Sequence, residues 1–180
     1  KNAYDENTIK AISSYKTESE AYDTNLNAIK LAKQLSKEKR PATNDEKNIL
    51  ASYRGWGGLA AIFDHAHTSH SSKRVELQEL LSNDEYISLK RSTLSAFYTS
   101  PLLVNSVWNA MKHLGLNEGF GIDPAFGIGN FASAMPIDMQ DKVTLQAKEL
   151  DPLTAEIARH IHGPLIKNEG YEKAKIPSNT

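Results

Sequence analysis

The sequence predicts an α/β fold with a parallel sheet, preceded by an α-helical extension. Two short apolar runs, residues 120–123 and 143–149, each end in an acidic residue and have the length of a buried strand. Helical patterns alternate with these two runs, whereas residues 1–95 are helical in character. This order favours a doubly wound parallel sheet with right-handed crossovers. We therefore expect two domains, at residues 1–95 and 96–180.

Three helical patterns make up the first region. Apolar residues recur at helical spacing over residues 19–40, and Pro41 ends this pattern. Thr43 and Glu46 form a capping box, which predicts a second helix that runs through residue 53. A third pattern covers residues 75–89 and contains a break near its middle.

The second region is predicted to begin with a helix after residue 100. Ser100 is a typical N-cap, and Pro101 suits the first helical position. The helix carries an apolar stripe and closes at Gly115; the stripe consists of Leu102, Leu103, Val107, Met111 and Leu114. We also expect a short helical turn at residues 130–135.

Another helix is predicted after the second strand. Asp151 is its N-cap, Pro152 its first residue, and Gly163 its end. Residues 165–167 are expected to start a third strand. In such sheets a ligand lies outside the carboxyl ends of the strands.

Composition bounds the class of protein. The chain has 180 residues, a net charge of -1 and no cysteine, so disulfides and thiolate zinc sites are excluded and a reducing cytoplasm is expected. It has no apolar run long enough to span a membrane. The charge argues against a strongly basic nucleic-acid surface over the whole chain. Because it begins with Lys1, we expect a piece of a longer protein.

A tight glycine turn follows the first predicted strand. Gly127 and Gly129 let the backbone approach a ligand where any Cβ would collide. The nicotinamide pattern G-x-G-x-x-G is matched only with Ala132 in the third position, and Asp123 upstream would repel a pyrophosphate. A positively charged sulfonium with its amino-acid group suits this acid better. The alternative is an ordinary strand-to-helix turn.

Glu149 closes the second predicted strand, at the same edge of the sheet as Asp123. Its carboxylate is able to accept hydrogen bonds from both hydroxyls of a ribose. Asp151 is interpreted as the helix cap alone. The pair of strand-end acids therefore predicts a nucleoside site.

Three motifs carry a resemblance to a known family. Phe97-Tyr98-Thr99-Ser100-Pro101, the run from Asp123 to Phe131, and Lys148-Glu149-Leu150-Asp151-Pro152 resemble the cofactor motifs of S-adenosylmethionine-dependent adenine-N6 DNA methyltransferases. The chain is most similar to the methylase region of large methylase–helicase fusion proteins of phages, plasmids and conjugative elements. In those proteins a run like Arg54–Leu59 precedes the Tyr-Thr-Ser-Pro motif. The resemblance covers about residues 25–175.

The resemblance implies a partial Rossmann-like methyltransferase fold that binds S-adenosylmethionine. Asp123 would face the methionine ammonium, Glu149 the ribose hydroxyls and Leu150 the adenine, with Glu172 near the adenine amino group. The implied cofactor-binding residues are Tyr98, Thr99, Ser100, Pro101, Asp123, Pro124, Ala125, Gly127, Gly129, Asn130, Phe131, Glu149, Leu150 and Glu172.

The family's catalytic motif, Asn-Pro-Pro-Tyr or similar, does not occur in this sequence. The resemblance would place it just after residues 177–180, so we expect no catalytic residue in this chain. DNA and a helicase in the same polypeptide are the implied partners. Two alternatives stay open: a methyltransferase acting on RNA, protein or a small molecule, and a non-catalytic module that holds DNA or a helicase.

Weaker patterns lie in the first region. His65, His67 and His70 have conceivable metal spacing, but we expect solvent-exposed histidines and no metal. Trp56, among glycines, is interpreted as a structural plug rather than a base-stacking platform. Basic residues end the first helix, and a solvated face is favoured over phosphate contacts; they are Lys30, Lys33, Lys37, Lys39 and Arg40.

Overall fold

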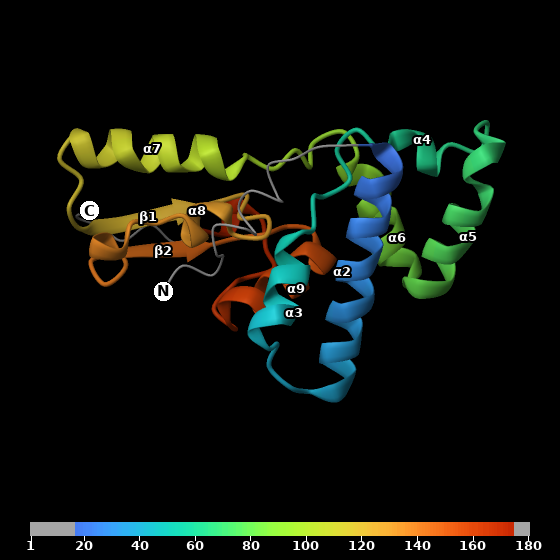
Figure 1. Ribbon diagram of the computed structural model, residues 1–180, viewed down its shortest axis with the longest axis horizontal. Coiled ribbons are helices and arrows are strands. Elements are labelled where there is room, and N and C mark those ends of the chain that lie inside the picture. Colours follow the sequence, from blue (N-terminus) through green and yellow to red (C-terminus); the bar gives the residue numbers. More distant parts are fainter. Residues whose placement is uncertain (1–16, 175–180) are drawn as a thin grey trace.

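The computed structural model describes residues 17–174 as a mixed α/β fold with a small parallel sheet. Figure 1 shows the sheet and one long helix, α7, on one side and the helices α2, α5 and α6 on the other. The helices are α2 (Glu18–Glu38), α3 (Asn44–Ala51), α4 (Ala60–Phe63), α5 (Ser71–Leu80), α6 (Asn83–Ser92), α7 (Pro101–His113), α8 (Asn130–Ser133) and α9 (Pro152–His162). Short 3-10 turns are η1 (Thr68–His70), η2 (Ile137–Met139) and η3 (Tyr171–Lys173), and the strands are β1 (Gly119–Asp123) and β2 (Val143–Ala147).

The helix starts predicted from capping residues are confirmed, since caps depend on short-range hydrogen bonds. The third helical pattern, predicted from residue 75, begins earlier, at Ser71. Thr43 and Glu46 form the complete capping box of α3, and Asp151 accepts from the Thr154 N–H at 2.7 Å. The break in the third helical pattern is also confirmed, since Ser82 caps α6 through a second capping box. The prediction that the second helix runs through residue 53 is wrong. That helix, α3, ends at Ala51.

The sheet is smaller than the predicted doubly wound one. β1 and β2 are parallel and in register from Gly119 opposite Val143 to Asp123 opposite Ala147. The predicted third strand is reduced to a single parallel bridge between Lys148 and Lys167. Pairing stops there because the side chain of Asn168 donates to the carbonyls of Glu149 and Leu150, both at 2.9 Å. The second strand accordingly ends at Ala147, two residues before the predicted end.

The predicted burial of the first strand and of the α7 stripe needs correction. β1 is half-buried or exposed along its whole length. On α7 the buried residues after Pro101 are Val104 and Trp108, whereas Leu102, Leu103 and Leu114 are exposed. The indole of Trp108 sets this face, because its Nε1 donates to the carbonyl of Phe131 at 2.8 Å.

An apolar cavity of about 370 Å³ lies between α7 and the sheet. It is lined by side chains of α7, both strands and the segment between them, and one end of it reaches residues 123 and 124. The lining includes Val107, Trp108, Met111, Leu116, Phe120, Ile122, Phe131, Val143 and Leu145.

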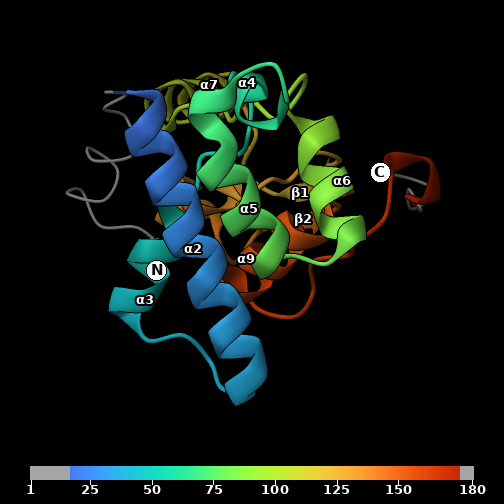
Figure 2. The ribbon, with the colours of Figure 1, turned by 90° about the vertical axis from the view of Figure 1, so that its right-hand side faces the viewer.

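The main hydrophobic core contains residues from both sides of the predicted domain boundary at residue 95. Leu153, Ile157 and Ile161 on one face of α9 belong to the same buried cluster as the apolar residues of α2 and α3. Figure 2 shows α2, α5 and α6 in front of the sheet, with α9 beside it. The domain boundary near residue 95 stays a prediction, and the two regions share one core. None of the helices within residues 17–174 combines the length and apolarity needed to cross a membrane.

Candidate functional site

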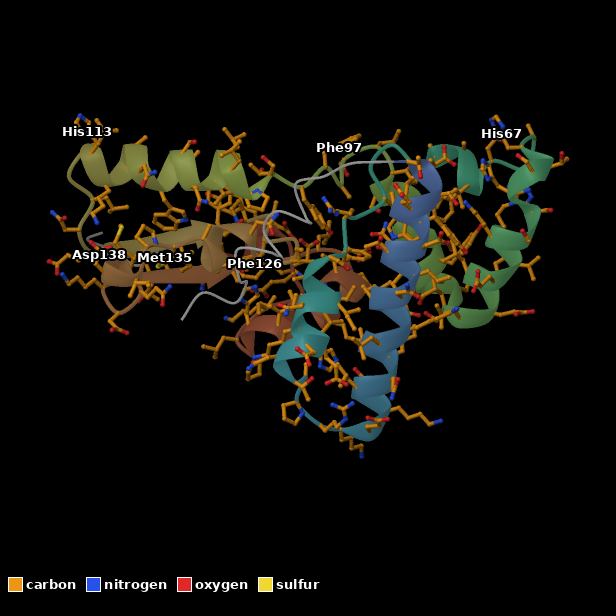
Figure 3. All side chains as sticks on the ribbon, viewed as in Figure 1. His67, Phe97, His113, Phe126, Met135 and Asp138 are labelled. Carbon is orange, nitrogen blue, oxygen red and sulfur yellow. The ribbon has the colours of Figure 1, made fainter. Side chains whose placement is uncertain are left out.

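A cavity of about 270 Å³ opens at the carboxyl end of β1. Figure 3 labels two aromatic residues of its wall, Phe97 and Phe126, which lie near the junction of the sheet and the helical side. We call it the Asp123 cavity. Its lining is Phe97, Tyr98, Thr99, Asp123, Ala125, Phe126, Gly127, Ile128, Asn130 and Phe131. Seven of the fourteen residues implied by the resemblance therefore meet in one cavity.

Asp123 supplies the only carboxylate in this lining, and no lysine, arginine or histidine is among the described residues that form it. Asp123 is half-buried, and its Oδ1 accepts a hydrogen bond from the N–H of Ala125 at 3.4 Å. Burial raises the pKa of this carboxyl above its usual value. A half-buried carboxylate with no basic side chain in the cavity wall is suited to a ligand that brings a positive charge.

Asn130 is the second polar side chain of the cavity. It begins α8 and is buried, with 9% of its surface exposed. Its Nδ2 donates to the carbonyl of Thr99 at 2.8 Å, which joins the turn after β1 to the segment before α7. The carbonyl oxygen Oδ1 is buried and has no hydrogen-bond partner within the described part of the chain.

The two glycines of the turn adopt positive φ angles, +56° at Gly127 and +82° at Gly129. A Cβ on Gly127 would lie 3.2 Å from the Tyr98 ring, and one on Gly129 would lie 2.3 Å from Nε2 of His162. The space beside each glycine is thus filled by the protein's own side chains. Backbone conformation and packing explain both glycines without a ligand.

Tyr98 forms the wall beside Gly127. Its hydroxyl is 3.3 Å from Oγ1 of Thr154 on α9, and its ring lies 6.1 Å from that of Tyr53. Phe97, its neighbour, is 68% exposed at the cavity mouth. The Phe97–Pro101 motif thereby contacts both the helical side and the glycine turn.

Glu149 lies just past the end of β2 and reaches back to the glycine turn. Its Oε2 accepts from the Gly127 N–H at 2.7 Å, and its Oε1 accepts from the Asp151 N–H at 2.9 Å. Burial raises the pKa of Glu149, although these backbone donors oppose the shift. A carboxylate has about four acceptor sites, more than these backbone donors occupy, so the side chain is able to accept further hydrogen bonds.

The other implied residues do not line this cavity. Ser100 and Pro101 line an adjoining cavity of about 150 Å³, and Pro124 lines the apolar cavity. Leu150 is 72% exposed beyond Glu149. Glu172 is exposed in η3 and lines none of these three cavities.

The Arg54–Leu59 run is a largely buried loop, with Gly58 exposed, and its Gly55 and Gly57 pack against Tyr98 and Phe97. Asn25 of α2 holds it: Nδ2 donates to the Gly55 carbonyl at 2.6 Å and Oδ1 accepts from the Arg54 N–H at 2.7 Å. The N–H of Gly57 donates to the carbonyl of Ala96 at 3.1 Å. This loop connects α2 to one wall of the cavity.

Trp56 is fully buried within that loop and packs edge-on against Tyr22 and Phe63. Its Nε1 donates to the hydroxyl of Tyr53 at 3.0 Å. A ring with no exposed surface cannot stack on a base, which agrees with the structural interpretation of this residue.

Two residues of the site's surroundings were not predicted from the sequence, Asn25 and His162. The Nε2 of His162 is 2.8 Å from the carbonyl of Ile128, and its ring packs edge-on against Phe126. Burial lowers the pKa of His162, so the neutral ring with a proton on Nε2 fits this contact. A polar residue in an otherwise apolar helical pattern was the available signal for Asn25.

Several histidines and basic residues of the first region lie close to acidic side chains. His67 lies 3.7 Å from Asp64 and His70 lies 3.3 Å from Glu18, and residues 17–174 contain no group of three or more potential metal ligands. Among the basic residues, three form ion pairs: Lys30 with Glu76, Lys33 with Glu85, and Arg40 with Glu38 and Glu46. These pairs favour the solvated face over phosphate contacts.

No family model matches the chain, and no curated protein or solved structure is significantly similar to it. Residues 177–180, after which the resemblance would place the catalytic motif, lie outside the described residues. Function is therefore inferred from the motifs and the geometry of the cavity.

Proposed function

We propose that this chain binds S-adenosylmethionine as the cofactor-binding part of a DNA adenine-N6 methyltransferase. The observation that carries the proposal is the Asp123 cavity. A half-buried carboxylate ends β1, four aromatic rings stand around it, and the lining contains no basic side chain among the described residues. A sulfonium cofactor with an α-ammonium group brings the positive charges that such a cavity lacks.

Each end of the cofactor has a counterpart. The methionine end would lie in the Asp123 cavity, against the Phe97–Pro101 segment. Glu149, 2.7 Å from the Gly127 amide, has free lone pairs for the ribose hydroxyls. Leu150 is 72% exposed next to it and offers apolar surface to an adenine ring.

The bound cofactor would supply a methyl group to an adenine amino nitrogen. The residues described here contribute binding and orientation: Asp123 neutralises charge, the aromatic wall excludes water, and Glu149 fixes the nucleoside. The Asn-Pro-Pro-aromatic motif that holds the target amino group in this family is absent from the sequence. Methyl transfer to DNA is therefore proposed for a protein that also carries that motif.

The two alternative classes differ in what supports them. A methyltransferase for another substrate would bind S-adenosylmethionine in the same cavity. The cavity therefore supports cofactor binding for that class as well. A module that only holds DNA is less favoured, because Lys30, Lys33 and Arg40 already pair with carboxylates.

A calorimetric titration with S-adenosylmethionine tests the proposal. The wild-type protein should bind one cofactor, and Asp123→Ala and Glu149→Ala should each weaken binding by about ten- to hundredfold, as expected for hydrogen bonds to charged groups. Asp138→Ala is the matched control, because Asp138 is an exposed acid paired with Lys112 outside the cavity. Absence of binding by the folded wild-type protein would overturn the proposal.

A further inference from the structure

Lys148 directly precedes Glu149 and carries a buried charge. Only 1% of its side chain is exposed, and its ammonium group pairs with the carboxylate of Glu169, whose side chain is 26% exposed. Taking an ammonium group out of water costs free energy, and the attraction of one carboxylate often does not return it. Stability alone is therefore a weak explanation for this ion pair.

The backbone of Lys148 joins the ends of the two strands. Its N–H donates to the carbonyl of Asp123, and its carbonyl accepts from the N–H of Phe126, both at 2.9 Å. The same residue forms the single parallel bridge to Lys167. Lys148 thus fixes the backbone beside both strand-end acids.

The segment that follows the bridge holds the turn after β2. The Nδ2 of Asn168 donates to the carbonyls of Glu149 and Leu150, both at 2.9 Å. Glu169 comes next in the chain and bonds to Lys148. Asn168 is exposed, so water competes for its amide, whereas Lys148 is shielded from water. Because a buried ion pair is screened less than an exposed contact, the Lys148–Glu169 pair is the firmer anchor of this segment.

We propose that the Lys148–Glu169 ion pair positions the nucleoside end of the cofactor site. The pair holds the segment of Asn168 against the Glu149–Leu150 turn, so that the Glu149 carboxylate keeps the orientation in which it receives the ribose hydroxyls. Neither member of the pair lines any of the three cavities described above. This inference rests on the proposed function and assigns positioning roles to two residues outside the binding surface.

Titrations with two probes test the role: S-adenosylhomocysteine and its 2′,3′-dideoxyribose analogue. Wild-type protein should prefer the hydroxylated probe by about tenfold or more, the worth of a hydrogen bond to a charged group. Lys148→Met should reduce this preference to less than about threefold, because hydrogen bonds weaken steeply when their geometry is lost. A general loss of stability would lower the affinity for both probes equally and leave the preference unchanged.

Two further variants complete the design. The double variant Lys148→Met with Glu169→Gln removes both charges, serves if the single variant does not fold, and should lose the preference in the same direction. Lys112→Met breaks an exposed ion pair with Asp138, outside the Asp123 cavity, and should keep the wild-type preference.

The outcomes separate the two proposals. If folded wild type binds neither probe, the proposed function and this inference both fall. If wild type binds both probes equally, cofactor binding stands and the positioning role falls. If wild type prefers the hydroxylated probe and the Lys148 variants keep that preference, only this inference is overturned.

Discussion

Two buried asparagines, one in the helical region and one beside the sheet, differ in how completely their side-chain amides are hydrogen-bonded. In the helical region Asn25 is fully buried, and both atoms of its amide are bonded to the Arg54–Gly55 backbone. Beside the sheet, Asn130 is bonded only through Nδ2. One buried asparagine thus has a fully hydrogen-bonded amide, whereas the other keeps a buried oxygen without a partner among the described residues.

The carboxylates repeat this contrast. In the helical region Glu46 is paired with Arg40, whose hydrogen bonds lower the pKa of Glu46 to about 2. At the strand ends Asp123 and Glu149 have no basic partner among the described residues, and burial raises the pKa of each. Glu46 is thus compensated by a cation of the protein, whereas the two strand-end acids are not, although other acids near the sheet, Asp138 and Glu169, do pair with lysines.

The largest expected effect is at Asn25. Asn25→Leu removes the two buried hydrogen bonds to the N–H of Arg54 and the carbonyl of Gly55, which should cost roughly 2–5 kcal/mol of unfolding free energy. Urea denaturation followed by circular dichroism measures it. Asn27→Leu, an exposed neighbour on the same helix, should change stability little. Equal, small effects of the two substitutions would remove the architectural role of Asn25.

The glycine turn comes next. Gly129→Ala should destabilise by about 2–4 kcal/mol, because the φ of +82° disfavours alanine and the new methyl group meets His162 and Phe126. Gly115→Ala is the matched control: its φ is +97° but no atom lies within 4 Å of the new Cβ. The difference between the stability losses of the two variants, measured by thermal denaturation, gives the contribution of the steric clash. If both cost the same, the packing explanation for Gly129 is wrong.

Asp123→Asn should stabilise the unliganded protein while weakening cofactor binding. The substitution removes a half-buried carboxylate that lacks a cationic partner, and we expect the melting temperature at pH 7 to rise by roughly 2–4 °C, equivalent to about 1 kcal/mol for a chain of this size. Differential scanning fluorimetry without ligand measures it. A lower melting temperature would mean that the Asp123 carboxylate stabilises the fold.

The pH dependence of this difference has a definite sign. The folded-state pKa of Asp123 is raised, so folding favours the protonated form. The group's stabilising contribution is complete below the unfolded pKa of about 4 and is lost as the pH rises through the higher folded value. The advantage of Asp123→Asn should therefore grow from pH 4 upward and become constant above the raised pKa. An advantage that shrinks over this range would contradict the assignment.

The smallest effect is expected at Asn130. Asn130→Leu loses the bond to Thr99 but also removes a buried unpaired oxygen, so stability should change by less than about 1 kcal/mol. Urea denaturation in parallel with Asn25→Leu sharpens the comparison. A loss as large as that of Asn25→Leu would assign Asn130 to the architecture.

The sequence predicted what depends on neighbours in the chain. The cap at Thr43 follows from Glu46 three positions on, and those at Ser100 and Asp151 from the proline that comes next; the structure contains all three caps. The acids at the strand ends were predicted because parallel strands end at one edge of a sheet. Seven of the proposed site residues accordingly meet in one cavity.

What the sequence did not predict depends on distant partners. The buried face of α7 was misassigned because a leucine pattern does not reveal that Trp108 bonds to Phe131. The two hydrogen bonds of the Asn25 side chain reach Arg54 and Gly55, which lie 29 and 30 positions further along the chain. Packing across the core decides such contacts, and they carry no local signal.

A crystal structure of the protein with S-adenosylmethionine bound tests the central claim most directly. We expect the ligand's amino nitrogen about 3 Å from the Asp123 carboxylate, with the ribose beside Glu149. A ligand whose amino group lies elsewhere, for example in the apolar cavity under α7, would contradict it.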